Sequence, residues 1–280
     1  PNLCRIRCNA SKQRNTISLV IRLLPMKIPA LDELGLPEVC KELVLKPRGL
    51  VVVSGPTGSG KSTTLTAMIN YLNHVERRCV VTIEDPIEHI YSNDKCTITQ
   101  RELGSDTRSF AEALKHVLRQ DPNVILVGEM RDLETASAVL TIAETGHLVL
   151  TTGHASSAPQ TIERIVDIFP PHERPLAQSR LASLLVGILC QVLVPKADGS
   201  GRVAAIEVKL ASPAVRNTIR EGRIHQLPNA MLTQARLGMV LLDHALVNLY
   251  RKGVISRESV LAFCNYPDEV TKLIGSIEQG

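Results

Sequence analysis

The sequence predicts an α/β protein with a mostly parallel sheet, flanking helices and a phosphate-binding loop. Short runs of apolar and β-branched residues alternate with helix-like stretches from Gly49 onward. The segment SGPTGSGKST, residues 54–63, stands between such a run and a helix-like stretch, and acidic residues directly follow two later runs. Short, fully apolar strands between helices are typical of a doubly wound parallel sheet, whose two faces are both covered by helices.

The composition limits the classes of protein to which the chain can belong. The 280 residues are enough for one large or two medium domains, and 44% hydrophobic with 21% charged residues is ordinary for a globular protein. The longest apolar run, residues 184–190, is far below the ~20 residues that span a bilayer. Aromatic residues make up only 2%, and 32 basic residues are scattered among 28 acidic ones. A channel that stacks nucleic-acid bases is therefore poorly supported, and no nucleic-acid partner is expected.

The first part of the chain reads as a small domain and a linker. Residues 1–27 alternate weakly and contain the run ISLVIR, which predicts two or three strands of a domain cut short at its start. The chain lacks an initial Met and opens inside a predicted strand, so we expect N-terminal sequence to be missing. Residues 28–48 contain a short helix between prolines and are predicted to be a linker.

The α/β core is predicted over residues 49–195 and a mainly helical region over 196–280. We expect strands at 50–54, 79–83, 124–127 and 147–151. We expect helices from residue 61, at 109–120 and at 133–144, and a loop after residue 83. Later, two apolar segments, 192–194 and 202–208, flank the turn sequence DGSG and predict a hairpin within the helical region.

The glycine-rich segment has the pattern of a P-loop. Gly55, Gly60, Lys61 and Ser62 meet the spacing G-x-x-x-x-G-K-S/T, with a strand before it and a helix after it. In such a loop backbone N–H groups and the helix N-terminus hold anionic oxygens. Lys61 is expected to reach the β- and γ-phosphates and Ser62 to bind Mg²⁺. The predicted nucleotide-binding residues of the loop are Gly55, Pro56, Thr57, Gly58, Ser59, Gly60, Lys61, Ser62 and Thr63.

Carboxylates follow two of the predicted strands. Glu84 and Asp85 come after residues 79–83, and Glu129 comes two residues after 124–127. Ligands of such sheets bind at the carboxyl ends of the strands, so one carboxylate can hold Mg²⁺ directly or through water while another orients the attacking water. The sequence leaves open which does which.

Two histidines bracket a further strand. His154 follows it and is expected at the ligand-binding end of the sheet, whereas His147 begins it and is expected at the opposite end. A cation beyond Lys61 is usually needed against the charge of the transition state. Arg131 and the arginines near the N-terminus are candidates, although charge alone does not select among them.

Four blocks in order resemble the secretion ATPase superfamily of type II secretion systems and type IV pili. They are GPTGSGKST at 55–63, TIEDPIEHIY at 82–91, LRQDPNVILVGEMRDLETA at 118–136 and TGHLVLTTGHASSA at 145–158, similar to the Walker A, Asp box, Walker B and His box motifs. The resemblance runs from Arg5 to about Lys272.

Several features are similar to the branch of this family that retracts pili. They are the segments VGEMRDLETA at 127–136 and IVDIFPPHER at 165–174, together with SPAVRNTIRE at 212–221, which resembles an AIRNLIRE motif. The seven cysteines lack the C-x2-C spacing of the zinc insertion common in assembly and secretion ATPases. Three positions depart from the pattern. Gly153 replaces Leu, which would loosen the strand end, while Val215 replaces Ile and the polar Thr218 replaces Leu on a helix face.

The resemblance implies a ring-shaped homohexamer in which each subunit has an N-terminal PAS-like α+β domain, truncated here, and a RecA-like P-loop domain. ATP and Mg²⁺ would bind between the domains. Glu84, Glu129 and Lys61 would be the catalytic residues. Ser62 and Glu129 would bind the metal, directly or through water. Asp85 and His154 would contact or sense the nucleotide. The family's phosphate-contacting arginines match Arg5, Arg7 and Arg22.

The resemblance also implies partners and a location, and the alternatives stay open. The partners would be an inner-membrane pilus platform protein and other pilus ATPases, and the location the cytoplasmic side of the inner membrane at the pilus base. The function implied first is ATP-driven pilus retraction. The alternatives are a pilus-assembly or secretion ATPase of the same superfamily, a nucleic-acid motor on the same core, and an ATP-binding factor without turnover.

Overall fold

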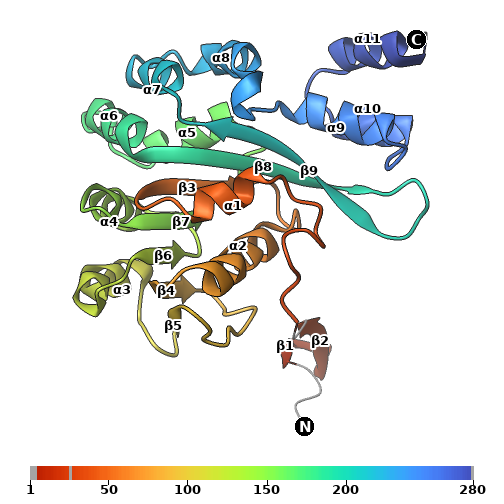
Figure 1. Cartoon of the computed structure of the whole chain (residues 1–280). Coiled ribbons are helices and arrows are strands. Elements are labelled where there is room, and N and C mark those ends of the chain that lie inside the picture. Colours follow the sequence, from red (N-terminus) through yellow and green to blue (C-terminus); the bar gives the residue numbers. More distant parts are fainter. Residues whose placement is uncertain (1–4, 25–26, 279–280) are drawn as a thin grey trace.

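A seven-stranded sheet lies at the centre of the protein (Figure 1). The computed structural model describes residues 5–24 and 27–278, with side chains through residue 275. The strand order is β5-β4-β6-β7-β3-β8-β9. Neighbouring strands are parallel except for β8 and β9, which are antiparallel. The predicted α/β fold with a mostly parallel sheet and flanking helices is therefore confirmed.

The strands of this sheet include those expected from the sequence and one that was missed. Their bounds are β3 Gly49–Ser54, β4 Cys79–Glu84, β5 Thr97–Glu102, β6 Val124–Val127, β7 Leu148–Thr152, β8 Leu185–Pro195 and β9 Arg202–Leu210. The expected hairpin is formed by β8 and β9. The loop predicted after residue 83 was wrong in part, because it contains β5. This strand is at the edge of the sheet and mostly polar, so it lacks the apolar run that marks the central strands.

Helices cover both faces of the sheet. Their bounds are α1 Val39–Val44, α2 Lys61–Val75, α3 Phe110–Val117, α4 Leu133–Glu144, α5 Ala158–Asp167, α6 Arg174–Leu184, α7 Pro213–Arg220, α8 Leu227–Thr233, α9 Leu242–Arg251, α10 Arg257–Phe263 and α11 Pro267–Glu278. One buried apolar cluster joins the sheet to α3, α4, α5, α6, α7 and α8, and another joins its other face to α1 and α2. A third cluster packs α9, α10 and α11 against the far ends of β8 and β9. None of the helices in the described part is long and apolar enough to cross a membrane.

Short polar side chains set where several helices begin. The hydroxyl of Ser109 accepts a hydrogen bond from Glu112 N at the start of α3, and Asp132 accepts one from Thr135 N at the start of α4. Ser157 and Ser212 cap α5 and α7 in the same way. These caps satisfy N–H groups that have no partner within the helix, so the helices begin at defined residues near the strand ends.

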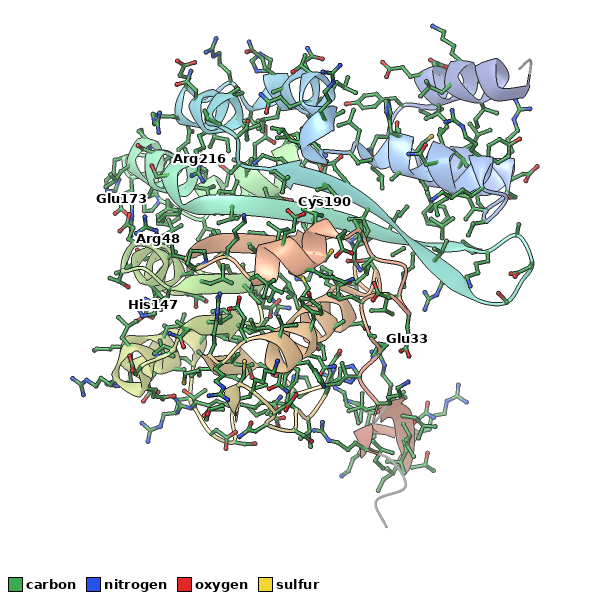
Figure 2. The ribbon with its side chains drawn as sticks, viewed as in Figure 1. Glu33, Arg48, His147, Glu173, Cys190 and Arg216 are labelled. Carbon is green, nitrogen blue, oxygen red and sulfur yellow. The ribbon has the colours of Figure 1, made fainter. Side chains whose placement is uncertain are left out.

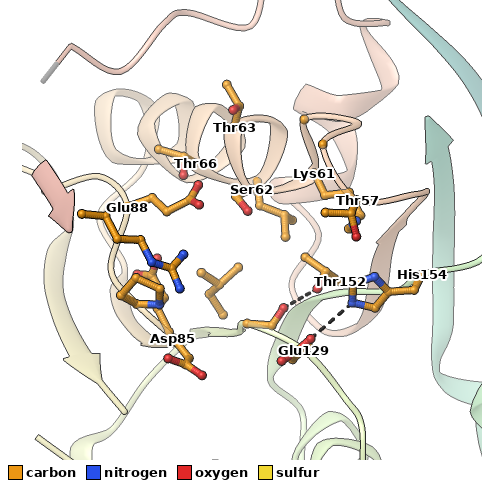
Figure 3. A pocket seen from close by; sticks show the side chains of 18 of the residues that line it. Thr57, Lys61, Ser62, Thr63, Thr66, Asp85, Glu88, Glu129, Thr152 and His154 are labelled. Atoms are coloured by element: carbon orange, nitrogen blue, oxygen red, sulfur yellow. Dashed lines mark hydrogen bonds and ion pairs between the residues drawn. The ribbon is translucent and has the colours of Figure 1, made fainter. Parts of the chain in front are cut away.

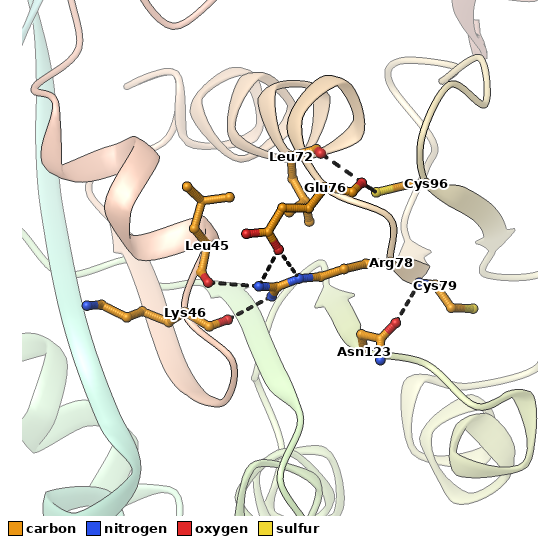
Figure 4. Close-up of polar contacts among 8 residues, drawn as sticks. All are labelled: Leu45, Lys46, Leu72, Glu76, Arg78, Cys79, Cys96 and Asn123. Atoms are coloured by element: carbon orange, nitrogen blue, oxygen red, sulfur yellow. Dashed lines mark hydrogen bonds and ion pairs between the residues drawn. The ribbon is translucent and has the colours of Figure 1, made fainter.

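The linker helix α1 is fastened to the core at its C-terminal end. Arg78 donates hydrogen bonds to the carbonyl oxygens of Leu45 and Lys46, both at 2.8 Å, and forms an ion pair with Glu76 (Figure 4). Cys40, at the other end of α1, is fully buried. The helix therefore belongs to the packed core and gives the chain a fixed entry into β3.

The N-terminal part forms a separate two-stranded hairpin. Strands β1, Arg5–Gln13, and β2, Thr16–Leu24, are antiparallel, and this hairpin agrees with the strands expected there. Residues 1–4 and 25–26 of the predicted N-terminal domain lie outside the described residues. Its apolar side chains are largely exposed, Ile17 at 71% and Leu23 at 69%, so the hairpin has little core of its own.

Candidate functional site

A cavity of about 480 Å³ lies at the carboxyl ends of the central strands, beside the start of α2 (Figure 3). It brings together most of the predicted site residues, which come from loops far apart in the sequence. Those that line it are Thr57, Gly58, Gly60, Lys61, Ser62, Thr63, Glu84, Asp85, Glu129, His154, Arg7 and Arg22. Arg131 lines it as well. His147 is not among the lining residues and precedes β7 at the opposite end of the sheet, as expected (Figure 2).

The P-loop has the conformation of an anion cradle. Gly58 and Gly60 have φ values of 78° and 89°, in the left-handed region that glycine adopts without strain. Lys61 Nζ folds back to donate to the carbonyl oxygens of Gly55 at 2.9 Å and Pro56 at 3.0 Å. Burial lowers the pKa of Lys61, and Glu129 acts in the opposite direction. The two carbonyl oxygens therefore hold the amino group of Lys61 within the loop.

Four of the predicted site residues do not line the cavity. Gly55 and Pro56 contact Lys61 through their backbone oxygens, and Ser59 is buried, with 3% of its surface exposed. Arg5 also lies outside the lining, where Nη1 donates to Glu88 O at 3.3 Å. Arg7 and Arg22 are cross-strand partners and share one face of the hairpin. Arg5, two residues before Arg7, is on the same face but at the end of the strand, opposite Leu24.

Two basic side chains contact the carboxylate of Glu129. His154 Nε2 lies 3.2 Å and Arg131 Nε 2.6 Å from the same oxygen, Oε2. Nearby, Thr152 Oγ1 donates to the carbonyl oxygen of Gly128, which links the end of β7 to the segment carrying Glu129. Glu129 is thus held by neighbours from two loops.

Glu84 has different surroundings. Thr82 Oγ1 donates to Glu84 Oε1 at 2.6 Å and Gln100 Nε2 to the same oxygen at 3.3 Å. Burial is the largest influence and raises the pKa of Glu84, although these two hydrogen bonds act against it. The site therefore contains one carboxylate that is paired with an arginine and one that burial makes more basic.

Gly153 does not loosen the end of β7, contrary to expectation. Its N–H donates to Val53 O at 2.9 Å, and Ser54 Oγ bridges the carbonyl oxygen and N–H of Ala155 at 2.8 and 3.0 Å. A Cβ on residue 153 would lie 2.9 Å from Ser54 Oγ, so the close approach of these strands requires glycine there. The loop with His154 is consequently fastened to the strand that enters the P-loop.

The retraction-like helix α7 is also held firmly. Val215 and Ile219 are its buried residues, while Thr218 lies beside them and donates to Ala214 O at 3.0 Å. Arg216 donates to the carbonyl oxygens of Ala182 and Ser183 at the end of α6 (Figure 2). The polar Thr218 is therefore compatible with the packing of this helix.

Sequence reasoning did not single out several cavity residues, some of them inside the quoted motif blocks and others, such as Phe110 and Arg202, outside them. They are Leu65, Thr66, Pro86, Glu88, Phe110, Leu126, Gly128, Thr152, Leu193 and Arg202. Gln191 was also missed, although a polar residue inside the apolar run of β8 is a signal. It is 2% exposed and contacts the P-loop on both sides.

Comparisons with known proteins show the family to which the chain belongs. The family model described as "Type II/IV secretion system protein" matches residues 4–260. The chain belongs to this family. It is 48% identical over 268 residues to the type IV pilus retraction ATPase PilT of Pseudomonas aeruginosa, covering 96% of this chain and 78% of that protein. It is 47% identical over 259 residues to a twitching motility protein of Neisseria gonorrhoeae, covering 92% and 69%.

A solved structure of a family member has the same fold. The crystal structure of the pilus retraction motor PilT with bound ADP superposes with a TM-score of 0.89 at 43% identity, covering 95% of this chain and 76% of that one. The resemblance to the secretion ATPases, drawn from four sequence blocks, is therefore confirmed, and its similarity to the retraction branch with it. As a member of this family of ATPases, the chain is an enzyme that binds nucleotide.

Proposed function

We propose that the protein is an ATP-hydrolysing motor that powers retraction of type IV pili. The observation that carries this proposal is 48% identity over 268 residues to a pilus retraction ATPase. The complete set of P-loop, acidic and basic side chains around one cavity supports turnover of ATP rather than binding alone.

The residues suit binding and hydrolysis of ATP with Mg²⁺. The described residues contain no cluster of three or more His, Cys, Asp or Glu side chains that could cage a metal. This agrees with Mg²⁺, which is commonly held by one or two protein oxygens and substrate phosphates, here the Ser62 hydroxyl and the Glu129 carboxylate, directly or through water. The ion would neutralise charge that develops on the phosphate oxygens.

Glu84 and Lys61 divide the remaining chemistry in this proposal. The raised pKa of Glu84 makes it the better general base for the attacking water. Lys61 stabilises the β- and γ-phosphates after leaving the carbonyl oxygens of Gly55 and Pro56. Arg7 and Arg22 reach the cavity from the hairpin, so their contact with phosphate would make closure of the hairpin sensitive to the nucleotide. His154 senses the nucleotide through its contact with Glu129.

The wider assembly follows the family. The functional units are the hairpin region 1–27 of a PAS-like domain, the linker 28–48, the RecA-like core 49–195 and the region 196–280. The active form is a homohexamer at the cytoplasmic side of the inner membrane, at the pilus base, where it acts on the platform protein beside other pilus ATPases. Movement of the domains during hydrolysis is the motion passed to the platform.

Expression in a bacterium that lacks its retraction ATPase tests this function. We expect restored twitching and a return of surplus surface pili to the normal number. The Lys61→Ala variant, expressed at the same level, should restore neither. Rescue of a strain lacking its pilus-assembly ATPase, with no effect on the retraction mutant, would contradict retraction and favour the assembly ATPase.

A further inference from the structure

We propose that Gln191, in the middle of β8, is a positioning residue that holds the P-loop in the shape that receives phosphates. The proposal rests on the nucleotide-binding function proposed above. It concerns a side chain that does not line the cavity and that the sequence motifs do not include.

Gln191 contacts the loop on both sides of its phosphate-binding part. Its Nε2 donates to the carbonyl oxygen of Ser59 at 2.5 Å, and its Oε1 accepts from Thr64 Oγ1 at 2.9 Å. Between these two anchors lie residues 60–63, which all line the cavity. The amide therefore clamps the two ends of the segment that would bind the phosphates.

The chemistry of these contacts determines how the amide is oriented. The carbonyl oxygen of Ser59 can only accept, so the amide nitrogen must face it. The amide oxygen then faces Thr64, whose hydroxyl donates. Only a side chain with a donor and an acceptor on one planar group serves both partners. A methionine of similar length serves neither, and a carboxylate serves Thr64 alone.

This clamp directs backbone donors toward the cavity. In a planar trans peptide the C=O and the following N–H point in opposite directions. Because Gln191 holds Ser59 C=O toward β8, the N–H of Gly60 is turned to the cavity side, where an anion can accept from it. Donors that are already oriented bind developing charge without a cost of reorganisation.

The loop also lies directly on Gln191. A Cβ on Gly60 would be 3.1 Å from Gln191 Nε2, and a Cβ on Gly55 would collide with the backbone oxygen of Gln191. Strand β8 thus leaves no room for a side chain at position 55 and little room at position 60. Gln191 is 2% exposed, so water cannot replace its hydrogen bonds if it is removed.

Binding of ADP, measured by calorimetry on the full chain, tests the proposal. Gln191→Met should weaken ADP binding by about tenfold or more, the loss expected when two hydrogen bonds to the loop disappear. Gln178→Met is the matched control, because Gln178 Nε2 also donates to a backbone carbonyl, that of Arg220 at 3.2 Å, far from the cavity lining. It should bind ADP like the parent.

A second variant separates positioning from mere packing. In Gln191→Glu the carboxylate repels Ser59 O at pH 8, but the protonated acid can donate as the amide does. We expect ADP affinity relative to the parent to recover as the pH falls from 8 to 6. Thr64→Val, which removes one anchor, should lose about threefold to tenfold. These two variants carry the test if Gln191→Met does not fold.

The results that would overturn the proposal are distinct from failure of the proposed function. Two results would contradict the positioning role of Gln191 while leaving nucleotide binding intact. One is an ADP affinity like that of the parent in folded Gln191→Met, and the other is an ADP affinity of Gln191→Glu that does not recover as the pH falls. A folded parent chain that binds no ADP contradicts the nucleotide-binding function itself, and with it the proposal.

Discussion

His154 Nε2 and Arg131 Nε both contact Oε2 of Glu129, at 3.2 and 2.6 Å. The His box and Walker B segments of this family thus meet at a single carboxylate oxygen. A new partner for this carboxylate, such as a metal-bound water, would therefore compete with the contacts of both His154 and Arg131. With the roles proposed above for these residues, the contact of His154 with Glu129 would link hydrolysis to the loop that precedes α5.

Replacement of Glu129 by glutamine should stop turnover while sparing binding. Glu129→Gln keeps the size of the side chain but removes the charge that serves the metal and the water. We expect kcat to fall by about 100-fold or more, with ADP affinity within a few-fold of the parent. Phosphate release measures the first quantity and calorimetry the second. Glu163→Gln, on an exposed part of α5, is the control and should hydrolyse ATP normally. Parent-like turnover in Glu129→Gln would remove this residue from catalysis.

The raised pKa of Glu84 should make both turnover and stability depend on pH, in opposite directions. As a general base it must be ionised, so kcat falls as pH decreases through its raised pKa. For stability the sign is opposite. Between the ordinary and the raised pKa the folded state binds more protons than the unfolded state, so the free energy of unfolding falls as pH rises.

The Glu84→Gln variant checks both consequences at once. It should lose turnover and yet gain unfolding free energy at pH 8, by about 1.4 kcal/mol for each unit of the raised pKa. The gain should shrink at pH 5, where the parent carboxyl is increasingly protonated in both states. Urea unfolding at the two pH values measures this. An equal gain at both would show that Glu84 is not destabilised by its charge.

The contact of Gly153 with Ser54 predicts a paired substitution. Gly153→Leu restores the residue usual in the family but brings its Cβ to 2.9 Å from Ser54 Oγ. We expect a loss of unfolding free energy of about 1–3 kcal/mol, the range for overpacking. Ser54→Gly removes the obstructing atom, so the double variant should lose less than the sum of the single ones. Additive losses in urea unfolding would show that the two positions are not coupled.

The sequence predicted those parts of the fold and site that local patterns determine. Central strands such as β3 and β6 are apolar runs, and the P-loop has its own spacing, so both were predictable. The edge strand β5 is polar, and its pairing with β4 depends on the tertiary fold. Arg202 reaches the cavity only because β9 turns back beside β8, and Gln191 matters only because β8 lies beneath the loop. Such relationships depend on strand order, which local sequence does not determine.

Arg5 illustrates the same limit within a correctly predicted strand. The resemblance placed Arg5, Arg7 and Arg22 together, yet only the last two line the cavity. The register of the hairpin puts all three arginines on one face, and Arg5 differs because it begins β1 and donates instead to the carbonyl oxygen of Glu88.

The buried side chain of Lys209, which lies outside the nucleotide site, should make the free energy of unfolding depend on pH. The side chain is fully buried on β9, and its Nζ has no hydrogen-bond partner among the described residues. Burial lowers the pKa of Lys209 to about 7, against the favourable influence of Cys190 and Glu207. From about pH 7 up to the ordinary lysine pKa the unfolded state therefore binds more protons, and the free energy of unfolding rises with pH.

Lys209→Met should remove this dependence and stabilise the protein. Replacing a buried charge with an apolar side chain of similar volume commonly gains about 1–4 kcal/mol, and the gain here should be largest at pH 6–7 and smaller at pH 9. Urea unfolding across this range measures it, with Lys252→Met on the exposed end of α9 as the control for loss of a lysine charge. If the parent and Lys209→Met had the same unfolding free energy at every pH, the burial of Lys209 without a hydrogen-bond partner would be contradicted.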